Sequence, residues 1–160
     1  TFRRENMADR TVAQNRKARH DYFILETFEC GIVLTGTEIK SVRDGKVNLK
    51  EGYALIRNGE LWLVGVHISP YEKGSYYNHE PLRDRKLLMK KHEILRIFSK
   101  VREKGLTLVP LSVYLKEGRR AKVELALVKG KLLHDKRDSI AERDAKRDME
   151  RAVRQRNRDD

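Results

Sequence analysis

The sequence has few of the residues that stabilise small secreted proteins and none of the long apolar runs that span membranes. Its single cysteine, Cys30, excludes an internal disulfide and favours a reducing compartment. The apolar neighbours of Cys30 indicate a small buried side chain. No apolar run approaches the roughly 18 residues of a membrane span, and the start shows no signal-peptide pattern. We therefore expect a cytoplasmic protein without a membrane partner.

Motifs of catalysis and metal binding are also missing. The five histidines show no paired ligand spacing, and Cys30 has no cysteine partner, which disfavours a zinc site. There is no Gly-x-Ser-x-Gly elbow, no phosphate-binding glycine loop ending in Lys-Ser/Thr, and no carboxylate cluster typical of magnesium. The sequence predicts no catalytic residue, no metal and no cofactor. A metal-dependent RNA-processing enzyme stays open as an alternative.

Basic residues are abundant: 36 Lys and Arg stand against 24 Asp and Glu, which gives a formal charge of +12. Residues 131–160 hold 10 basic and 8 acidic residues, so the first 130 residues hold 26 basic and 16 acidic ones. The excess therefore lies in the first 130 residues. A positive surface of this kind indicates a polyanionic partner such as nucleic acid.

The length of 160 residues is enough for one domain with appendages. We expect a flexible basic lead-in over residues 1–20, a folded domain over residues 21–130 and a C-terminal tail over residues 131–160. The cations at the end of the lead-in either contact phosphate or belong to a solvated terminus.

Strand patterns fill most of the folded domain. Residues 22–34 predict two strand segments with a bend at Glu29-Cys30-Gly31. Asn58-Gly59 separates two apolar segments and predicts a hairpin, because both residues tolerate positive φ. A second hairpin is expected from residues 106–115 and 120–128, with Arg119, Arg120 and Lys122 at a tip that either enters an RNA groove or is solvated. We predict a mainly β protein with flanking helices, built as an OB-like, partly closed barrel.

Two helices are expected beside the barrel. Thr37 can cap a short helix that Gly45 ends, with Ile39 facing the core and Glu38, Lys40 and Arg43 pointing outward or along the rim. The spacing of Ile94, Ile97, Phe98 and Val101 predicts a second helix, which ends at Gly105. Between the two helices, residues 69–84 form a loop whose aromatic residues either stack on bases or cap the barrel.

The tail has weak helical signals. Ser139 and Glu142 have capping-box spacing, but the apolar stripe that follows is thin and largely alanine. An isolated helix of this length is marginal in water. We therefore predict a tail that is disordered when free and helical when bound.

Several segments resemble one family closely and in order. They are residues 15–22 (NRKARHDY), 31–41 (GIVLTGTEIKS), 67–71 (HISPY), 104–111 (KGLTLVPL) and 135–137 (DKR). Together they resemble the SmpB family, the SsrA-binding proteins of bacterial trans-translation, over residues 14–152. The resemblance implies an OB-like barrel that binds the tRNA-like domain of transfer-messenger RNA (tmRNA) and delivers it to stalled ribosomes, with no catalysis.

The resemblance also implies partners and contact residues. The partners are tmRNA, the rRNA of the 30S subunit, the 70S ribosome and, on the charged RNA, elongation factor Tu. By position in the matching segments and by local chemistry, we expect these tmRNA contacts: Asn15, Arg16, Lys17, Glu38, Lys40, Arg43, Arg119, Arg120 and Lys122. For Glu38, a carboxylate would accept from a base amino group or a 2′-hydroxyl rather than from phosphate.

The resemblance further implies that the tail enters the empty mRNA channel as a helix. The residues expected near the decoding centre are Lys131, His134, Asp135, Lys136 and Arg137. His134 resembles a position whose ring stacks on a decoding-centre base. Leu132 departs from the lysine expected after Lys131. The alternative is an OB-fold ribosomal or initiation-type protein that binds rRNA.

Overall fold

The computed structural model describes residues 9–73 and 77–130 together with Arg151. The contacts predicted for the tail therefore lie outside the described residues. The elements are, in chain order, β1 (Arg10–Gln14), α2 (Arg16–Asp21), β2 (Tyr22–Ile32), α3 (Gly36–Arg43), β3 (Val47–Asn48), β4 (Tyr53–Arg57), β5 (Glu60–Val64), β6 (His67–Ile68), β7 (Arg85–Leu88), α4 (Lys91–Lys104), β8 (Thr107–Lys116) and β9 (Arg120–Gly130).

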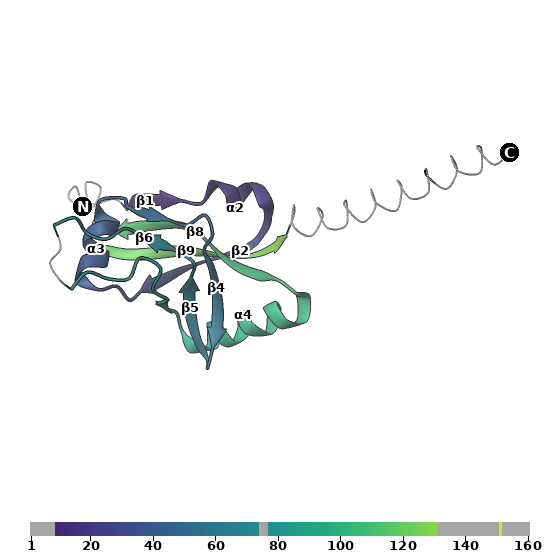
Figure 1. Cartoon of the computed structure of the whole chain (residues 1–160). Helices are drawn as coiled ribbons and strands as arrows, with labels where there is room; N and C mark the ends of the chain where they lie inside the picture. Colours follow the sequence, from purple (N-terminus) through teal and green to yellow (C-terminus); the bar gives the residue numbers. More distant parts are fainter. Residues whose placement is uncertain (1–8, 74–76, 131–150, 152–160) are drawn as a thin grey trace, which may run out of the picture.

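Six strands form a ring. Main-chain ladders join β8, β4, β5, β7, β2 and β9 in that order, and a further β8–β9 ladder completes the ring (Figure 1). Two joints in the ring are short, because β4 and β8 share the pair Ala54↔Leu108 and β2 and β7 share two pairs. The prediction of an OB-like, partly closed barrel that is mainly β is thus confirmed.

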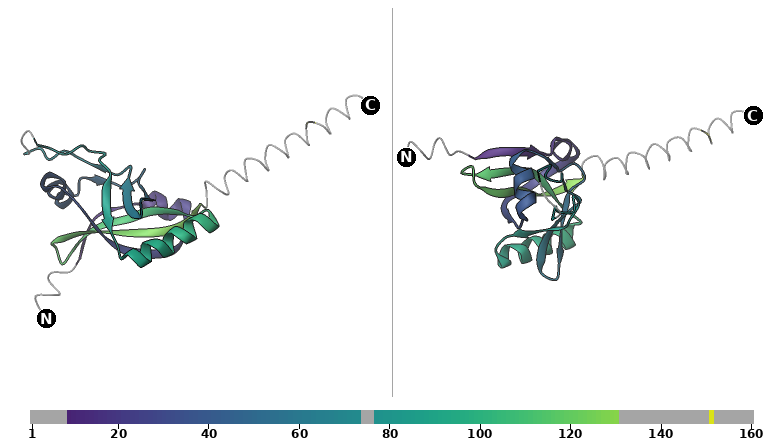
Figure 2. Two further views of the ribbon diagram at one scale, coloured as in Figure 1. Left: turned by 90° about the horizontal axis from the view of Figure 1, so that it is seen from below. Right: turned by 60° about the vertical axis from the view of Figure 1, so that its left-hand side comes forward.

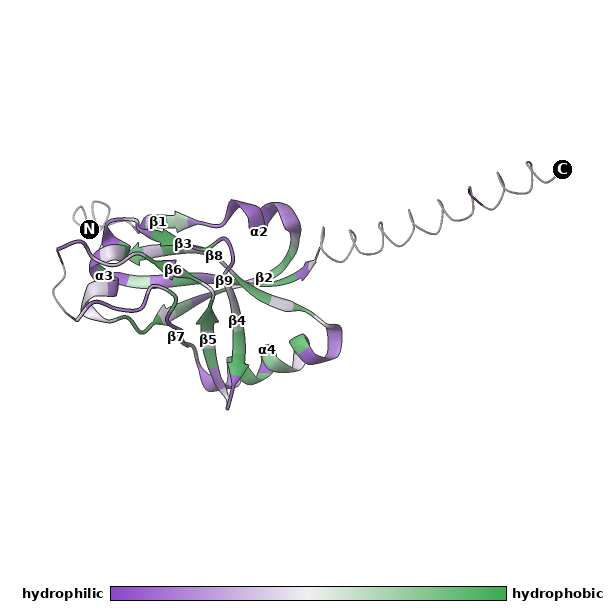
Figure 3. Ribbon diagram, viewed as in Figure 1, coloured by the Kyte–Doolittle hydropathy of each residue, from purple (hydrophilic) through white to green (hydrophobic). Residues whose placement is uncertain are grey.

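The barrel interior is filled by alternate residues of the strands. On β9, Val123, Leu125 and Leu127 are buried in the main core, whereas Lys122 and Glu124 face outward. Figure 3 shows hydrophobic residues concentrated along the strands and hydrophilic ones along α2. Helix α4 adds Ile94 and Ile97 to the core and ends at Gly105, which has a φ of 60°.

A second, smaller apolar cluster lies on the outside of the β8–β9 pair. Ala18 of α2 is 3% exposed there and packs against Val109 and Leu111 of β8 and Ala126 and Val128 of β9. Helix α2 therefore covers one half of this outer sheet face and leaves the half toward the hairpin tip open. Figure 2 shows α2 and the β8–β9 hairpin tip at different ends of the molecule.

Both predicted hairpins are confirmed. Asn58 and Gly59 have φ values of 53° and 75°, which turn β4 into β5. At the second hairpin Glu117 and Gly118 have φ values of 54° and 70°. The turn therefore brings Arg120 opposite Lys116 at the tip.

The bend predicted in residues 22–34 is wrong. Residues 22–32 form one strand, β2, that pairs with β9 from Tyr22↔Gly130 to Gly31↔Lys122. Its irregularity lies between Ile24 and Glu26. Because the long ladder supplies a partner along its whole length, Gly31 stays in the strand rather than breaking it.

The flexible lead-in predicted over residues 1–20 is wrong for residues 10–20. Strand β1 pairs with residues 112–115 of β8, and α2 follows at once. The segment lacks periodicity because it is short. Its order comes from contacts with other parts of the barrel, namely the edge of β8 and the apolar outer face under Ala18. The folded domain therefore begins by residue 10.

The loop over residues 69–84 folds back on the barrel where it is described. Asn78 bonds both main-chain groups of Tyr71, and buried His79 bonds Thr37 Oγ1 and the carbonyl of Ile68, both at 2.9 Å. The aromatic residues of this loop do not all pack on the barrel, because Tyr77 is 90% exposed. No helix in the described ranges has the length and hydrophobicity needed to cross a membrane.

Candidate nucleic-acid interface

Glu38 is buried in an ion network rather than exposed. Thr35, not Thr37, caps α3, and Glu38 completes its capping box by accepting from Thr35 N at 2.8 Å. Arg83 Nη2 and Arg85 Nε donate to its two carboxylate oxygens at 2.6 and 2.5 Å. Burial raises the pKa of Glu38, but hydrogen bonds from Arg83, Thr35 and Arg85 outweigh it and lower the pKa to about 2.

The predicted outward orientation of Glu38 is therefore wrong, and its 0% exposure leaves no oxygen to contact RNA. The physical reason is Arg85, which is also fully buried and donates to the carbonyls of Val66, Glu80 and Pro81. A buried guanidinium needs a counter-charge, and Glu38 supplies it. The alternation along β7 could have predicted the burial of Arg85, because Arg85 shares the inward face of this strand with Leu87.

Asn15 is also a supporting residue. It is 3% exposed, and its Oδ1 accepts from Ala18 N at 3.0 Å as the N-cap of α2. Its Nδ2 donates to the carbonyls of Leu49 and Pro110 at 3.1 and 2.9 Å. The amide of Asn15 is thus used to fix α2 on the barrel, and the predicted RNA contact by Asn15 stays a prediction that these bonds do not favour.

The other candidates on the barrel reach the surface at three places, which are α2, α3 and the β8–β9 hairpin. Arg16 and Lys17 are exposed on α2, beside one end of the β8–β9 sheet, while Lys40 and Arg43 are exposed on α3. Figure 1 shows α3 near the end of the molecule that is away from α2. Lys40 lies over the ring of Tyr71, with Nζ 5.5 Å from its centroid.

The hairpin cations border a hollow that reaches toward α3. Arg119, Arg120 and Lys122 line a space of about 390 Å³ together with Gly31, Ile32, Leu34, Ile39, Leu88 and Ala121. Its apolar floor therefore comes from β2, α3 and β7, and its cationic rim from the hairpin. Leu88 is 50% exposed, so apolar surface lies open in this hollow. The structure thus brings the hairpin candidates and Ile39 of α3 to one hollow.

The open outer face of the β8–β9–β2 sheet carries polar residues that were not among the predicted contacts. Tyr114 Oη donates to Glu29 at 2.6 Å, and Lys116 Nζ lies 2.8 Å from the same carboxylate. Hydrogen bonds from Lys116 and Tyr114 lower the pKa of Glu29, while burial and Glu29 raise the pKa of Tyr114. The signal was the alternation of Ser112, Tyr114 and Lys116 along β8.

This face also links the predicted contacts on α2 with those at the hairpin. Glu124 lies between Glu29 and Ser112 in the ladder and faces Arg19 of α2, whose Nη2 is 3.4 Å from its Oε1. Lys122 is the next outward residue toward the hairpin tip. Cations, carboxylates and a tyrosine therefore alternate from α2 to the hairpin, as expected of a surface that binds a polyanion and also reads base edges.

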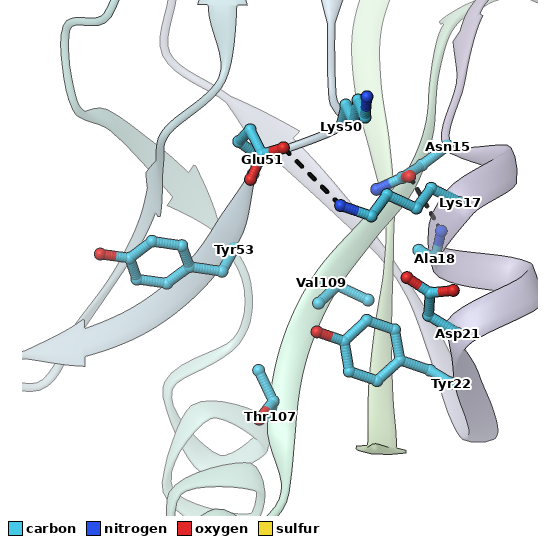
Figure 4. Close-up of a pocket in the computed structure, with 11 residues that line it drawn as sticks. Asn15, Lys17, Ala18, Asp21, Tyr22, Lys50, Glu51, Tyr53, Thr107 and Val109 are labelled. Carbon is cyan, nitrogen blue, oxygen red and sulfur yellow. Dashed lines mark hydrogen bonds and ion pairs between the residues drawn. The ribbon is translucent and has the colours of Figure 1, made fainter. Parts of the chain in front are cut away.

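A groove lies on the other side of α2. Lys17, Asp21 and Tyr22 form one wall, and Lys50, Glu51 and Tyr53 form the other (Figure 4). The space has a volume of about 700 Å³, and Thr107 and Val109 of β8 also line it. Tyr22 and Tyr53 were not among the predicted contacts, because each also fits a strand pattern.

The described barrel ends beside this groove. Gly130, the last residue of β9, is paired with Tyr22. The predicted ribosome contacts at Lys131, His134, Asp135, Lys136 and Arg137 lie outside the described residues. Among the described residues, no three His, Cys, Asp or Glu side chains are placed to hold a metal ion together.

Fold and surface together define an OB-like barrel with a cationic, aromatic-bearing exterior suited to nucleic acid. The family follows from direct comparison. The chain belongs to the SmpB family, whose model, described as "SmpB protein", matches residues 12–155.

Similar proteins agree with this assignment. The SsrA-binding protein of Desulforudis audaxviator is 65% identical over 146 residues, which cover 91% of this chain and 95% of the relative. That of Moorella thermoacetica is 62% identical and covers 92% and 95%. A solved chain described by the words "tmRNA-SmpB: a journey to the center of the bacterial ribosome" is 56% identical, with a TM-score of 0.63 over 74% of this chain and 83% of the solved one.

Proposed function

We propose that the protein binds tmRNA, the SsrA RNA, and delivers it to stalled ribosomes for trans-translation. Family membership carries this proposal, because relatives at 65% and 62% identity are named SsrA-binding proteins. The similar solved chain is described in terms of tmRNA, SmpB and the ribosome. The basic outer face of the barrel supports it independently, since clustered cations and tyrosines suit structured RNA.

The barrel supplies the contacts to tmRNA. Its surface cations are placed to hold phosphates. The exposed ones are Arg16, Lys17, Lys40, Arg43, Arg119 and Arg120, and half-buried Lys122 lies beside the last two. Glu38 and Asn15 take a different part, because they fix α3 and α2, on which several of these cations stand. The domain that binds RNA then spans residues 10–130.

The tail supplies the contacts to the ribosome. Residues 131–160 enter the empty mRNA channel, with Lys131, His134, Asp135, Lys136 and Arg137 near the decoding centre and the rRNA of the 30S subunit. Because Gly130 is paired with Tyr22, the tail leaves the barrel next to α2 rather than at the hairpin tip. Such a division lets the barrel hold one RNA while the tail reaches another.

The remaining expectations follow from this role. The protein acts by binding rather than by catalysis, in the cytoplasm where ribosomes work, and needs no cofactor. Elongation factor Tu on the charged RNA stays a predicted further partner.

Recovery of bound RNA tests the proposal. The tagged protein, purified from bacterial lysate, should retain one abundant tRNA-like species that also carries a reading frame. Recovery of 16S or 23S rRNA alone would instead favour a ribosomal or initiation-type protein. RNA that is shortened only when Mg²⁺ is added would favour an RNA-processing enzyme.

Deletion of residues 131–160 separates the two proposed parts. The shortened protein should keep nearly all of its affinity for the tRNA-like domain of tmRNA and lose ribosome rescue. His134→Ala should do the same more mildly. Equal losses in RNA binding and in rescue would contradict the division between barrel and tail.

A further inference from the structure

The groove between α2 and β4 lies at the weakest joint of the barrel. Strands β4 and β8 share the pair Ala54↔Leu108, and the groove lining includes Tyr53 and Thr107, the residues just before that pair. The strands separate there, and α2 and the turn before β4 form the walls. The resulting space of about 700 Å³ falls within the range of small-molecule sites.

The chemistry of the walls differs from that of a simple phosphate site. Figure 4 shows the Tyr22 and Tyr53 rings on opposite sides of the groove, with Lys17 and Asp21 above Tyr22. Aromatic rings offer stacking surfaces to unpaired bases, and carboxylates accept from the amino groups of bases. Asp21 already pairs with His20 Nδ1 at 3.1 Å and its side chain is 17% exposed, so the rings rather than this carboxylate distinguish the groove from a site for phosphate alone.

An ion pair crosses the mouth of this groove. Lys17 Nζ lies 3.7 Å from Glu51 Oε1, and these side chains are 51% and 75% exposed (Figure 4). At that distance and exposure the pair is weak. A phosphate oxygen that approached to ordinary hydrogen-bond length would hold Lys17 more closely than Glu51 does.

We propose that this groove is a subsite for one unpaired nucleotide of the bound RNA, with its base beside Tyr53 and Tyr22 and its phosphate on Lys17, which Glu51 occupies until the RNA displaces it. The inference rests on the RNA-binding function proposed above. It adds a ligand for this groove and a competing role for Glu51.

The Glu51→Gln variant tests the competition. Glu72→Gln is its matched control, since Glu72 makes a similar exposed pair with Lys46, at 3.4 Å and with side-chain exposures of 84% and 48%. Both variants change the net charge equally. Glu51→Gln should bind the transcribed tRNA-like domain of tmRNA about threefold more tightly, and Glu72→Gln should bind it like the wild type. Equal affinities for the two variants would overturn the competing role.

Combining Glu51→Gln with Lys17→Ala shows whether the tighter RNA binding depends on Lys17. Lys17→Ala should weaken binding and lower the slope of log affinity against log salt by about 1. In that background Glu51→Gln should no longer tighten binding, because the amine for which it competes is gone. A persistent gain would refute the link between the two residues.

The proposed contact with the base is tested at Tyr53. This residue is 43% exposed and can be replaced with little effect on the core. Tyr53→Ala should weaken RNA binding about tenfold, Tyr53→Trp should restore it, and Tyr77→Ala should leave it unchanged. If the wild type binds the RNA and Tyr53→Ala binds equally well, the subsite is refuted while the RNA-binding function stands. If the wild type does not bind, the function itself fails.

Discussion

The α3–β7 side and the α2–β4 side of the barrel use charged residues in opposite ways. On the first, Glu38 and Arg85 are fully buried, and every carboxylate oxygen of Glu38 has a donor within 2.8 Å. On the second, Lys17 and Glu51 are mostly exposed and 3.7 Å apart. Breaking a buried pair leaves an uncompensated charge in the core, whereas an exposed pair exchanges readily with solvent or another anion.

The difference shows how a basic protein can use separate charged residues to stabilise its fold and to bind its ligand. Buried Arg85 is committed to Glu38 and to main-chain carbonyls, so RNA cannot recruit it without unfolding the loop over residues 77–84. The exposed cations near α2 and at the hairpin have no comparable commitment. Charge at the surface thus serves binding, and charge inside serves structure.

Removing the buried carboxylate should have the largest effect. Glu38→Gln leaves Arg85 buried without a counter-charge, and should lower the free energy of unfolding by about 3–5 kcal/mol. Urea denaturation measures this. Glu72→Gln, at an exposed pair, should change stability by less than about 1 kcal/mol. Similar stabilities of the two variants would remove the contrast between the two sides.

Acid should weaken the α3–β7 side in the same way. The pKa of Glu38 in the folded protein is about 2, below its value in the unfolded chain, so its contribution is complete above about pH 4.5 and is lost as the pH falls toward 2. We expect about 3 kcal/mol of stability to disappear over this interval. The difference in unfolding free energy between wild type and Glu38→Gln, followed by denaturation from pH 6 to pH 2 in steps, should shrink accordingly. A constant difference would contradict the assigned ionisation.

The next largest loss of stability is expected at Asn15, which fixes α2 on the barrel. Asn15→Ala removes the cap of α2 and two donors to buried carbonyls, which should cost about 2 kcal/mol of stability. Asn48→Ala is the control, because exposed Asn48 makes one bond, to Lys50 N at 2.9 Å. If Asn15→Ala weakened RNA binding at full stability, Asn15 would be a direct contact after all.

Local patterns in the sequence predicted much of this architecture. Asn58-Gly59, the alternation along β8 and β9, and the spacing of Ile94 and Ile97 gave the hairpins, the outer face and α4, because each depends on neighbours in the chain. The surface cations at the hairpin were predicted for the same reason.

The failures share a physical cause, which is contact with residues far away in sequence. Glu38 is buried because Arg83 and Arg85, more than 40 positions later, reach it. Asn15 is buried because the carbonyl of Pro110, 95 positions away, accepts a hydrogen bond from its Nδ2. A polar residue in a basic segment looks the same in sequence whether it meets RNA or a carbonyl of its own fold.

The exposed cations at the β8–β9 hairpin are tested by a change that should spare stability. Replacing Arg119, Arg120 and Lys122 by alanine removes the cationic rim of the hairpin hollow. Affinity for the tRNA-like domain should fall about tenfold at moderate salt, and the salt slope by about 2 to 3, because up to three phosphate contacts are lost. Fluorescence titration at four salt concentrations measures both quantities. Alanine at Lys91, Arg102 and Lys104 of α4 makes the same change in charge on another surface, and equal losses from the two triples would mean that net charge, rather than the hairpin, holds the RNA.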